Sequence, residues 1–129
     1  MASNRIVAHW RDGRLTKGST GDFVPTRDLF HVAPVDGGPV VAIKISELKA
    51  IFFVKDFAGD AGHRRRNAFE APVVGRRIRV VFSDGEEMVG TTQSYHPGRA
   101  GFFVVPADLH GNNERCFVVA AATSEVVAF

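Results

Sequence analysis

The sequence predicts an all-β protein built of two tandem small β-barrels, each with five strongly bent strands and little helix. Three observations predict this fold: one pattern occurs twice, apolar residues alternate as they do in strands, and glycines recur at turns and bends. Residues 5–34 align with residues 77–106 at a shift of 72 without a gap, and residues 45–54 align with residues 120–129 at a shift of 75. The chain of 129 residues is therefore expected to contain one unit of about 55 residues twice.

The first two strands of each copy are predicted to form a hairpin. Alternating apolar residues lead into an Asp-Gly dipeptide, which is a strong signal for a tight β-turn. The first copy has Ile6, Ala8 and Trp10 before Asp12-Gly13, and the second has Ile78, Val80 and Phe82 before Asp84-Gly85. We expect Trp10 and Phe82 to point into equivalent cores. We expect the two aspartates to cap backbone N–H groups in the turns rather than to act in catalysis.

The remaining strands follow in the same order in both copies. Gly18 and Gly90 lie within the return strands, where glycine is typical of a sharp bend in a curved sheet. A third strand ends at Pro34 or Pro106. The fourth strands are predicted at residues 40–46 and 114–121, and the fifth at residues 50–54 and 125–129. Five short bent strands in each copy favour a small barrel.

Charge is concentrated between the copies. The net charge of +2 is too small to indicate nucleic-acid binding by itself. Residues 1–56 are predicted as the first barrel, 57–74 as a basic linker containing glycine and proline, and 75–129 as the second barrel. Clustered guanidinium groups can bind phosphates and attract polyanions, although most charge runs are simply solvated. The candidate polyanion-binding residues are Arg64, Arg65, Arg66, Arg76, Arg77 and Arg79.

Residues 6–32, with their Asp-Gly turn, bent strand and apolar third strand, resemble the first motif of the Sm-like proteins, which include Hfq and the LSm proteins. The segment ISELKAIFFV at residues 45–54 is similar to the second motif in its Hfq-like form. The resemblance implies that the fourth strand of one barrel pairs with the fifth strand of the next. The two copies are then expected to pair edge to edge within the chain, and several chains to form a homo-oligomer through strand edges.

The positions that hold RNA bases in Sm-like proteins carry other residues here. The usual Asn of the third loop is matched by Asp28 in the first copy and by Ala100 in the second. Ser46 to Lys49 and Ala122 to Ser124 replace the basic element of the second motif. The resemblance therefore predicts the fold more strongly than it predicts the usual uridine pocket. A weaker similarity to PilZ-like barrels, which bind a cyclic dinucleotide, rests on arginines just before the second barrel, but their RxxxR spacing is absent.

Few residues suggest catalysis or metal binding. The single cysteine, Cys116, lies in an apolar run and is predicted to be buried. The histidines lack the spacing of a metal site; they are His9, His31, His63, His96 and His110. No serine lies in a nucleophile elbow, and no phosphate-binding loop is present. We expect no enzyme activity, metal or cofactor.

Two further patterns concern packing and location. The adjacent pairs Phe52-Phe53 and Phe102-Phe103 place one ring on each face of a strand. We expect the outward rings to pack against the other copy rather than to form a binding surface. No apolar run reaches the roughly 18 residues of a membrane span, and the first residues lack the apolar region of a signal peptide. The expected location is the cytoplasm, without membrane contact.

The sequence thus predicts a non-enzymatic binding module that binds RNA or another polyanion through its basic segment. Two alternatives remain. One is a protein-interaction or oligomerisation module in a bacterial-type signalling or regulatory system, and the other is an effector that binds a cyclic dinucleotide.

Overall fold

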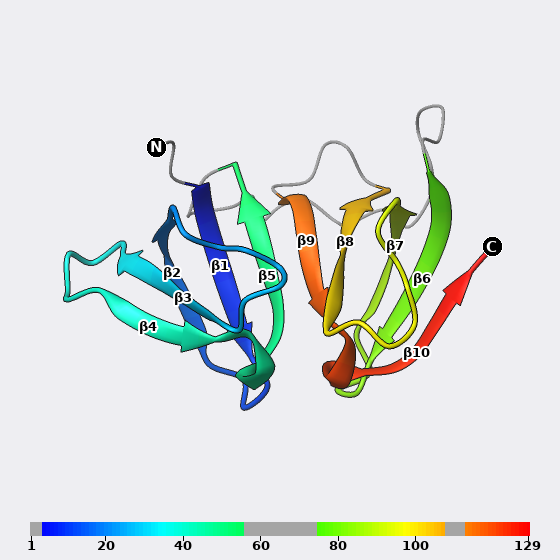
Figure 1. The fold of residues 1–129 in the computed structure, drawn as a ribbon, viewed down its shortest axis with the longest axis horizontal. Coiled ribbons are helices and arrows are strands. Elements are labelled where there is room, and N and C mark those ends of the chain that lie inside the picture. Colours follow the sequence, from blue (N-terminus) through cyan, green and yellow to red (C-terminus); the bar gives the residue numbers. More distant parts are fainter. Residues whose placement is uncertain (1–3, 56–74, 108–112) are drawn as a thin grey trace.

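The computed structural model describes residues 4–55, 75–107 and 113–129, which form ten strands and two short 3₁₀ turns (Figure 1). No helix formed by these residues is long and apolar enough to cross a membrane. The first half contains β1 (Asn4–Trp10), β2 (Leu15–Thr20), β3 (Leu29–Pro34), β4 (Val41–Lys44), η1 (Ile45–Glu47) and β5 (Leu48–Val54). The second half contains β6 (Arg76–Phe82), β7 (Glu87–Thr92), β8 (Gly101–Pro106), β9 (Asn113–Val119), η2 (Ala120–Ala122) and β10 (Thr123–Ala128).

The ten strands form one antiparallel sheet in the order β10-β6-β7-β8-β9-β5-β1-β2-β3-β4. Its end strands, β10 and β4, are not paired with each other, so the sheet does not close into a barrel. The all-β prediction is confirmed, whereas one continuous sheet takes the place of the two separate barrels that were expected. The pairing of β5 with β9 joins the halves along Ala50–Val54, and within each half the described fourth and fifth strands lie at opposite ends of the strand order and do not pair. Edge-to-edge pairing of the copies within the chain is therefore confirmed.

The two halves have the same strand order, which runs fifth, first, second, third, fourth in each. Their first hairpins also match. Gly13 and Gly85 occupy the turns with φ values of 94° and 93°, a region that favours glycine. The carboxylates of Asp12 and Asp84 accept hydrogen bonds from the N–H groups of Arg14 and Glu86, each at 3.0 Å. The predicted repeat of strands and turns, with its two capping aspartates, is confirmed.

The second strands bend where Gly18 and Gly90 were predicted to allow it. Gly18 lies opposite Pro34 of β3, and Gly90 lies opposite Pro106 of β8. A Cβ atom at either glycine would collide with a main-chain oxygen of the neighbouring strand and with a valine side chain. These two positions require glycine because the third strand crosses the second at very close range.

Two hydrophobic clusters lie on opposite faces of the central strands. In β5, Ile51 and Phe53 belong to the cluster of the first half, while Ala50, Phe52 and Val54 belong to the cluster of the second half. Consecutive strand residues point to opposite faces, so β5 contributes side chains to both cores. β9 does the same through Cys116 and Phe117, among others.

The predicted core positions are mostly confirmed. Phe82 is 1% exposed within the second cluster, whereas Trp10 is half-buried at the margin of the first. Cys116 is buried, as expected. Phe52 packs among residues of the second half, and Phe103 packs against the cluster of the first. The outward rings of the Phe-Phe pairs therefore cover the other half of the chain.

Lys49 ties the two halves together at the surface of the junction. Its ammonium group lies 2.7 Å from Asp84 Oδ2 and 2.6 Å from Glu86 Oε1, both in the turn between β6 and β7. Burial alone would lower the pKa of Lys49, but the hydrogen bonds to Asp84 and Glu86 outweigh it and raise that pKa. The hydrogen bond from Lys49 lowers the pKa of Asp84.

Candidate functional site

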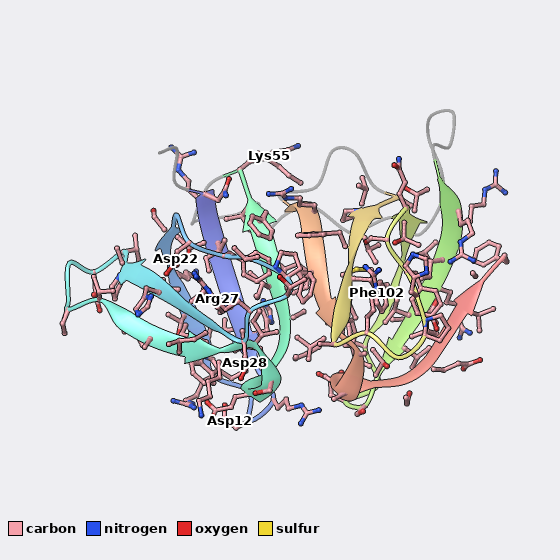
Figure 2. The ribbon with its side chains drawn as sticks, in the orientation of Figure 1. Asp12, Asp22, Arg27, Asp28, Lys55 and Phe102 are labelled. Carbon is pink, nitrogen blue, oxygen red and sulfur yellow. The ribbon has the colours of Figure 1, made fainter. Side chains whose placement is uncertain are left out.

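Basic side chains gather at one end of the sheet. β5 runs antiparallel to both β1 and β9, so the start of β1, the end of β5 and the start of β9 lie together. β6 also begins at this end, which is uppermost in Figure 1. Figure 2 shows Lys55 there, at the opposite end of the first half from Asp12. We define the basic end by the cations on these strand termini: Arg5, Lys55, Arg76, Arg77 and Arg115.

Arg115 is held against aromatic rings. Its guanidinium carbon lies 4.3 Å from the ring centroid of Phe53 and 5.1 Å from that of Phe103. Phe53 is the register partner of Arg115 across the β5–β9 pair, which explains the close approach. Stacking over a ring fixes the plane of the guanidinium group while its N–H groups remain able to donate hydrogen bonds.

Arg5 is positioned by the main chain. Its Nη1 donates a hydrogen bond of 2.9 Å to the carbonyl oxygen of Lys55, which leaves its other N–H groups available. Within residues 4–55, 75–107 and 113–129, neither Arg5 nor Arg115 forms an ion pair with a carboxylate. These two positive charges are therefore not offset by an ion pair within the described part of the chain.

A hollow of about 510 Å³ lies between these arginines at the junction of the halves. Most of its lining is polar, and Phe53, the aromatic residue of the lining, is only 3% exposed. The lining residues are Asn4, Arg5, Ser19, Phe53, Val54, Glu114 and Arg115. Two cations and small polar groups beside one carboxylate form a chemistry suited to an anionic ligand.

The three predicted binding arginines on β6 differ in their contacts with other residues of the chain. Arg76 donates from Nη2 to the carbonyl oxygen of Tyr95 at 3.0 Å and lies over the Tyr95 ring. Arg77 is exposed. Arg79 pairs with Glu87 at 3.1 Å and approaches Glu125 at 3.9 Å, so its charge is largely offset. Arg64, Arg65 and Arg66 lie outside the described residues.

A second hollow, of about 660 Å³, lies at the opposite side of the junction between the loops that follow β2 and β7. Asp28 and Arg99 are among its lining residues. The Asp28 carboxylate accepts hydrogen bonds from the N–H of Ser46 at 2.8 Å and from its hydroxyl at 3.1 Å. Asp28 therefore fastens its loop to η1, and Ala100 has no side-chain group for this role.

Asp22, the other acidic residue in the loop between β2 and β3, also forms hydrogen bonds. Asp22 accepts hydrogen bonds from the main-chain N–H of His31 at 2.9 Å and forms a contact of 2.6 Å with His31 Nδ1. The hydrogen bond with the His31 side chain is the main reason that the pKa of Asp22 is lowered. In the described part of the chain, no group of three His, Cys, Asp or Glu side chains is arranged to hold a metal ion.

Sequence reasoning predicted Arg76, Arg77 and Arg79 but did not single out Arg5, Lys55 or Arg115. One signal was available, because the shift of 72 places Arg5 on Arg77. Lys55 and Arg115 carried no such signal. They become neighbours of Arg5 only through the pairing of β5 with β1 and β9, which joins strands far apart in the sequence.

Residues 2–128 of the chain match the Family of unknown function (DUF6982), so the chain belongs to that family. No curated protein and no solved structure matches it.

Proposed function

We propose that this member of the DUF6982 family is a non-enzymatic binding module whose ligand is RNA or a similar polyanion. The observation that carries the proposal is the basic end, where Arg5 and Arg115 flank a hollow and neither pairs with a carboxylate among the described residues. Phosphate groups would bind the guanidinium groups, because such charge-assisted hydrogen bonds are strong and can be bidentate.

The aromatic rings beside Arg115 favour a single-stranded nucleic acid over a compact anion. Proteins that bind single strands combine cations that follow the backbone with aromatic rings on which bases stack. Phe103 is half-buried next to Arg115, so a base approaching this side would meet both a ring and a cation. Arg76 and Arg77, at the start of β6, extend the positive charge along the same end of the sheet.

We further propose that each half is an Sm-like module. The support is the pairing of the fifth strand of one half with the fourth strand of the other, β5 with β9, which is the contact that the resemblance implies. The loop position that usually holds a base is used differently, since Asp28 binds Ser46. The ligand would then bind the basic end rather than the usual base pocket.

The test is the salt dependence of binding to a labelled single-stranded RNA, measured by fluorescence anisotropy. The variant Arg5→Gln/Arg115→Gln removes two cations and retains side chains of similar length. It should weaken binding and reduce the slope of log K against log salt by about 0.7 for each lost phosphate contact. A triple variant, Arg64→Ala/Arg65→Ala/Arg66→Ala, tests the basic segment in the same way.

Arg11→Gln is the matched control, because Arg11 follows β1 at the opposite end of the sheet. It removes one positive charge and should leave the slope nearly unchanged. Thermal melts of all variants separate a binding defect from a folding defect. A loss of binding free energy from Arg11→Gln that is half of the loss from the basic-end variant, which removes two charges, would show that net charge alone drives binding. Absence of binding by the wild-type protein at low salt would refute the proposal.

A further inference from the structure

One residue of the hollow at the basic end has the opposite charge to its neighbours. Glu114 lines this hollow together with Arg5 and Arg115. Its side chain is exposed, and in the part of the chain that the structure describes its carboxylate forms no ion pair. A carboxylate accepts hydrogen bonds and donates none, so Glu114 repels phosphate groups. A ligand that binds here through phosphates alone would gain nothing from this residue.

A β-bulge brings Glu114 to the hollow. Phe53 of β5 lies opposite Arg115, and the next residue, Val54, lies opposite Asn113, so Glu114 has no register partner on β5. In a regular strand, consecutive side chains point to opposite faces. Glu114 and Arg115 nevertheless line the same hollow, because a bulge re-aims the side chains beside it. The strand therefore presents a pair of acceptor oxygens and a fork of donors to one ligand.

The two cations of the hollow differ in how they are held. The guanidinium carbon of Arg115 lies 4.3 Å from the ring centroid of Phe53 and 5.1 Å from that of Phe103, which fixes its plane. Arg5 is held through Nη1 alone, by the hydrogen bond of 2.9 Å to the Lys55 carbonyl oxygen. A guanidinium group of fixed plane suits a flat ligand with two adjacent acceptors, whereas Arg5 suits a phosphate oxygen.

Guanine is the base that matches a carboxylate and an arginine together. Its N1–H and N2–H groups lie next to each other and can donate to the two oxygens of one carboxylate. Its O6 and N7 atoms accept two hydrogen bonds from one arginine. Adenine and cytosine offer an amino group beside an acceptor nitrogen, and uracil offers one imino group between two carbonyl groups. A carboxylate therefore meets an acceptor on each of these three bases.

The size and the remaining lining of the hollow fit a nucleotide. Its volume of about 510 Å³ lies within the range of sites for small ligands, roughly 300–1,000 Å³. Asn4 and Ser19 also line it, and their amide and hydroxyl groups can hydrogen-bond the hydroxyl groups of a ribose.

We propose that the hollow binds a guanine base of single-stranded RNA. Glu114 accepts hydrogen bonds from N1–H and N2–H of the base, Arg115 donates to O6 and N7, and Arg5 binds an adjoining phosphate. The inference rests on the proposed function, because it concerns the same site, and it adds a base preference to a module that would otherwise bind any polyanion.

The test compares labelled oligouridines that carry one altered central nucleotide, measured by fluorescence anisotropy at one low salt concentration. The wild-type protein should bind the oligonucleotide with a central guanosine about tenfold more tightly than plain oligouridine. Central adenosine or cytidine should give no such gain. Inosine lacks the N2 amino group and 7-deazaguanosine lacks N7, so each should give an intermediate affinity.

Two variants assign the base preference to residues. Glu114→Gln replaces one acceptor oxygen by a donor, so it should reduce the guanosine preference to about twofold and strengthen binding of plain oligouridine, because a negative charge is removed. Arg115→Lys keeps the charge but loses the planar fork, so it should reduce the preference while oligouridine binds as before. Glu47→Gln is the matched control, because Glu47 lies in η1 at the opposite end of the sheet (Figure 1); it should retain the tenfold preference.

The outcomes separate this inference from the proposed function. Equal affinity of the wild-type protein for all the oligonucleotides would overturn the guanine preference and leave the proposed function standing, whereas no binding of any of them would refute both. An equal gain for every oligonucleotide in Glu114→Gln would show that Glu114 acts only through its charge. Equal affinities for free guanosine monophosphate and for the guanosine oligonucleotide would overturn the assignment to RNA. Far-UV circular dichroism verifies that each variant folds.

Discussion

The strands β5 and β10 occupy the same place in the two halves, yet their surroundings differ. β5 lies at the centre of the sheet, and six of its seven residues are buried. β10 lies at the end of the sheet, and none of its residues is fully buried. Their sequences reflect this difference. The sequence of β5, LKAIFFV, is almost entirely apolar, whereas that of β10, TSEVVA, contains three polar residues.

The difference between β9 and β4 has the same origin. Cys116, Phe117, Val118 and Val119 of β9 are all buried, whereas only Ile43 of the four residues of β4 is buried. A strand covered on both faces needs apolar residues at consecutive positions, while an end strand needs them only on one face. The two copies therefore share a topology, and their fourth and fifth strands differ in composition because these strands occupy different positions in one sheet.

The largest expected effect tests whether the halves are one folding unit. Phe82→Ala empties a fully buried site in the second half and should destabilise the protein by about 3–5 kcal/mol. Trp10, the only tryptophan, lies in the first half. Because β5 and β9 contribute to both cores, the unfolding transitions followed by Trp10 fluorescence and by far-UV circular dichroism should move together to lower denaturant concentration.

An unchanged Trp10 transition in Phe82→Ala would show that the halves unfold independently. The matched variant is Trp10→Ala, followed by circular dichroism alone. Because Trp10 is half-buried, its loss should cost less than that of Phe82, about 2 kcal/mol.

The second prediction concerns the bends that the halves share. Gly18→Ala and Gly90→Ala each place a Cβ atom against a main-chain oxygen and a valine, and each should cost about 1–3 kcal/mol. Gly21→Ala is the matched control, because a Cβ there meets no atom within 4 Å. Chemical denaturation should give the control a free energy of unfolding close to that of the wild-type protein. Similar losses of stability at all three sites would show that packing at the bends does not cause the losses.

These comparisons also show how much of the molecule could be predicted from the sequence. The strands, the Asp-Gly turns and the bends at Gly18 and Gly90 follow from short-range patterns, and the structure has them where expected. The edge-to-edge joint of the copies followed from the resemblance, but two separate barrels were predicted in place of one open sheet, because short-range patterns do not show whether the fourth and fifth strands of one copy pair with each other. Sequence patterns report which faces are apolar but not which partner covers them.

The candidate site shows the same limit. Arginines adjacent in sequence could be identified as a cluster, but Arg5 and Arg115 become neighbours only when β1, β5 and β9 pair. The offset charge of Arg79 was equally hidden, since Glu125 reaches it from the last strand of the chain.

The third prediction tests the polar contact across the junction. Lys49→Met removes the hydrogen bonds to Asp84 and Glu86 and the contact of the ammonium group with the Phe82 ring, and it retains an unbranched apolar side chain. Near neutral pH the loss should be about 1 kcal/mol, because the carboxylates are partly solvated.

The pH dependence of this contact has a definite sign. The pKa of Asp84 lies below its ordinary value of 3.8, so the stabilisation is present above that value and is lost as pH falls through the lowered pKa. The pKa of Lys49 lies above 10.5, so the stabilisation is also lost as pH rises through that raised value. Urea titrations at about pH 7 and pH 2 measure the difference in free energy of unfolding between wild type and Lys49→Met, and this difference should be smaller in acid. An equal difference at both pH values would mean that the charges contribute nothing to stability.

The smallest expected effect separates the two equivalent aspartates. Among the described residues, Asp12 bonds only within its own turn, to Arg14, whereas Asp84 bonds its turn and also Lys49 of the other half. In a double-mutant cycle, Asp84→Ala and Lys49→Met should therefore couple, by roughly 0.5 kcal/mol for a partly exposed pair. Asp12→Ala combined with Lys49→Met is the control cycle and should be additive, because Asp12 makes no described contact with Lys49. Chemical denaturation of the four proteins in each cycle measures both terms. Equal coupling in the two cycles would contradict a specific contact between the halves and would assign the effect to the loss of turn structure.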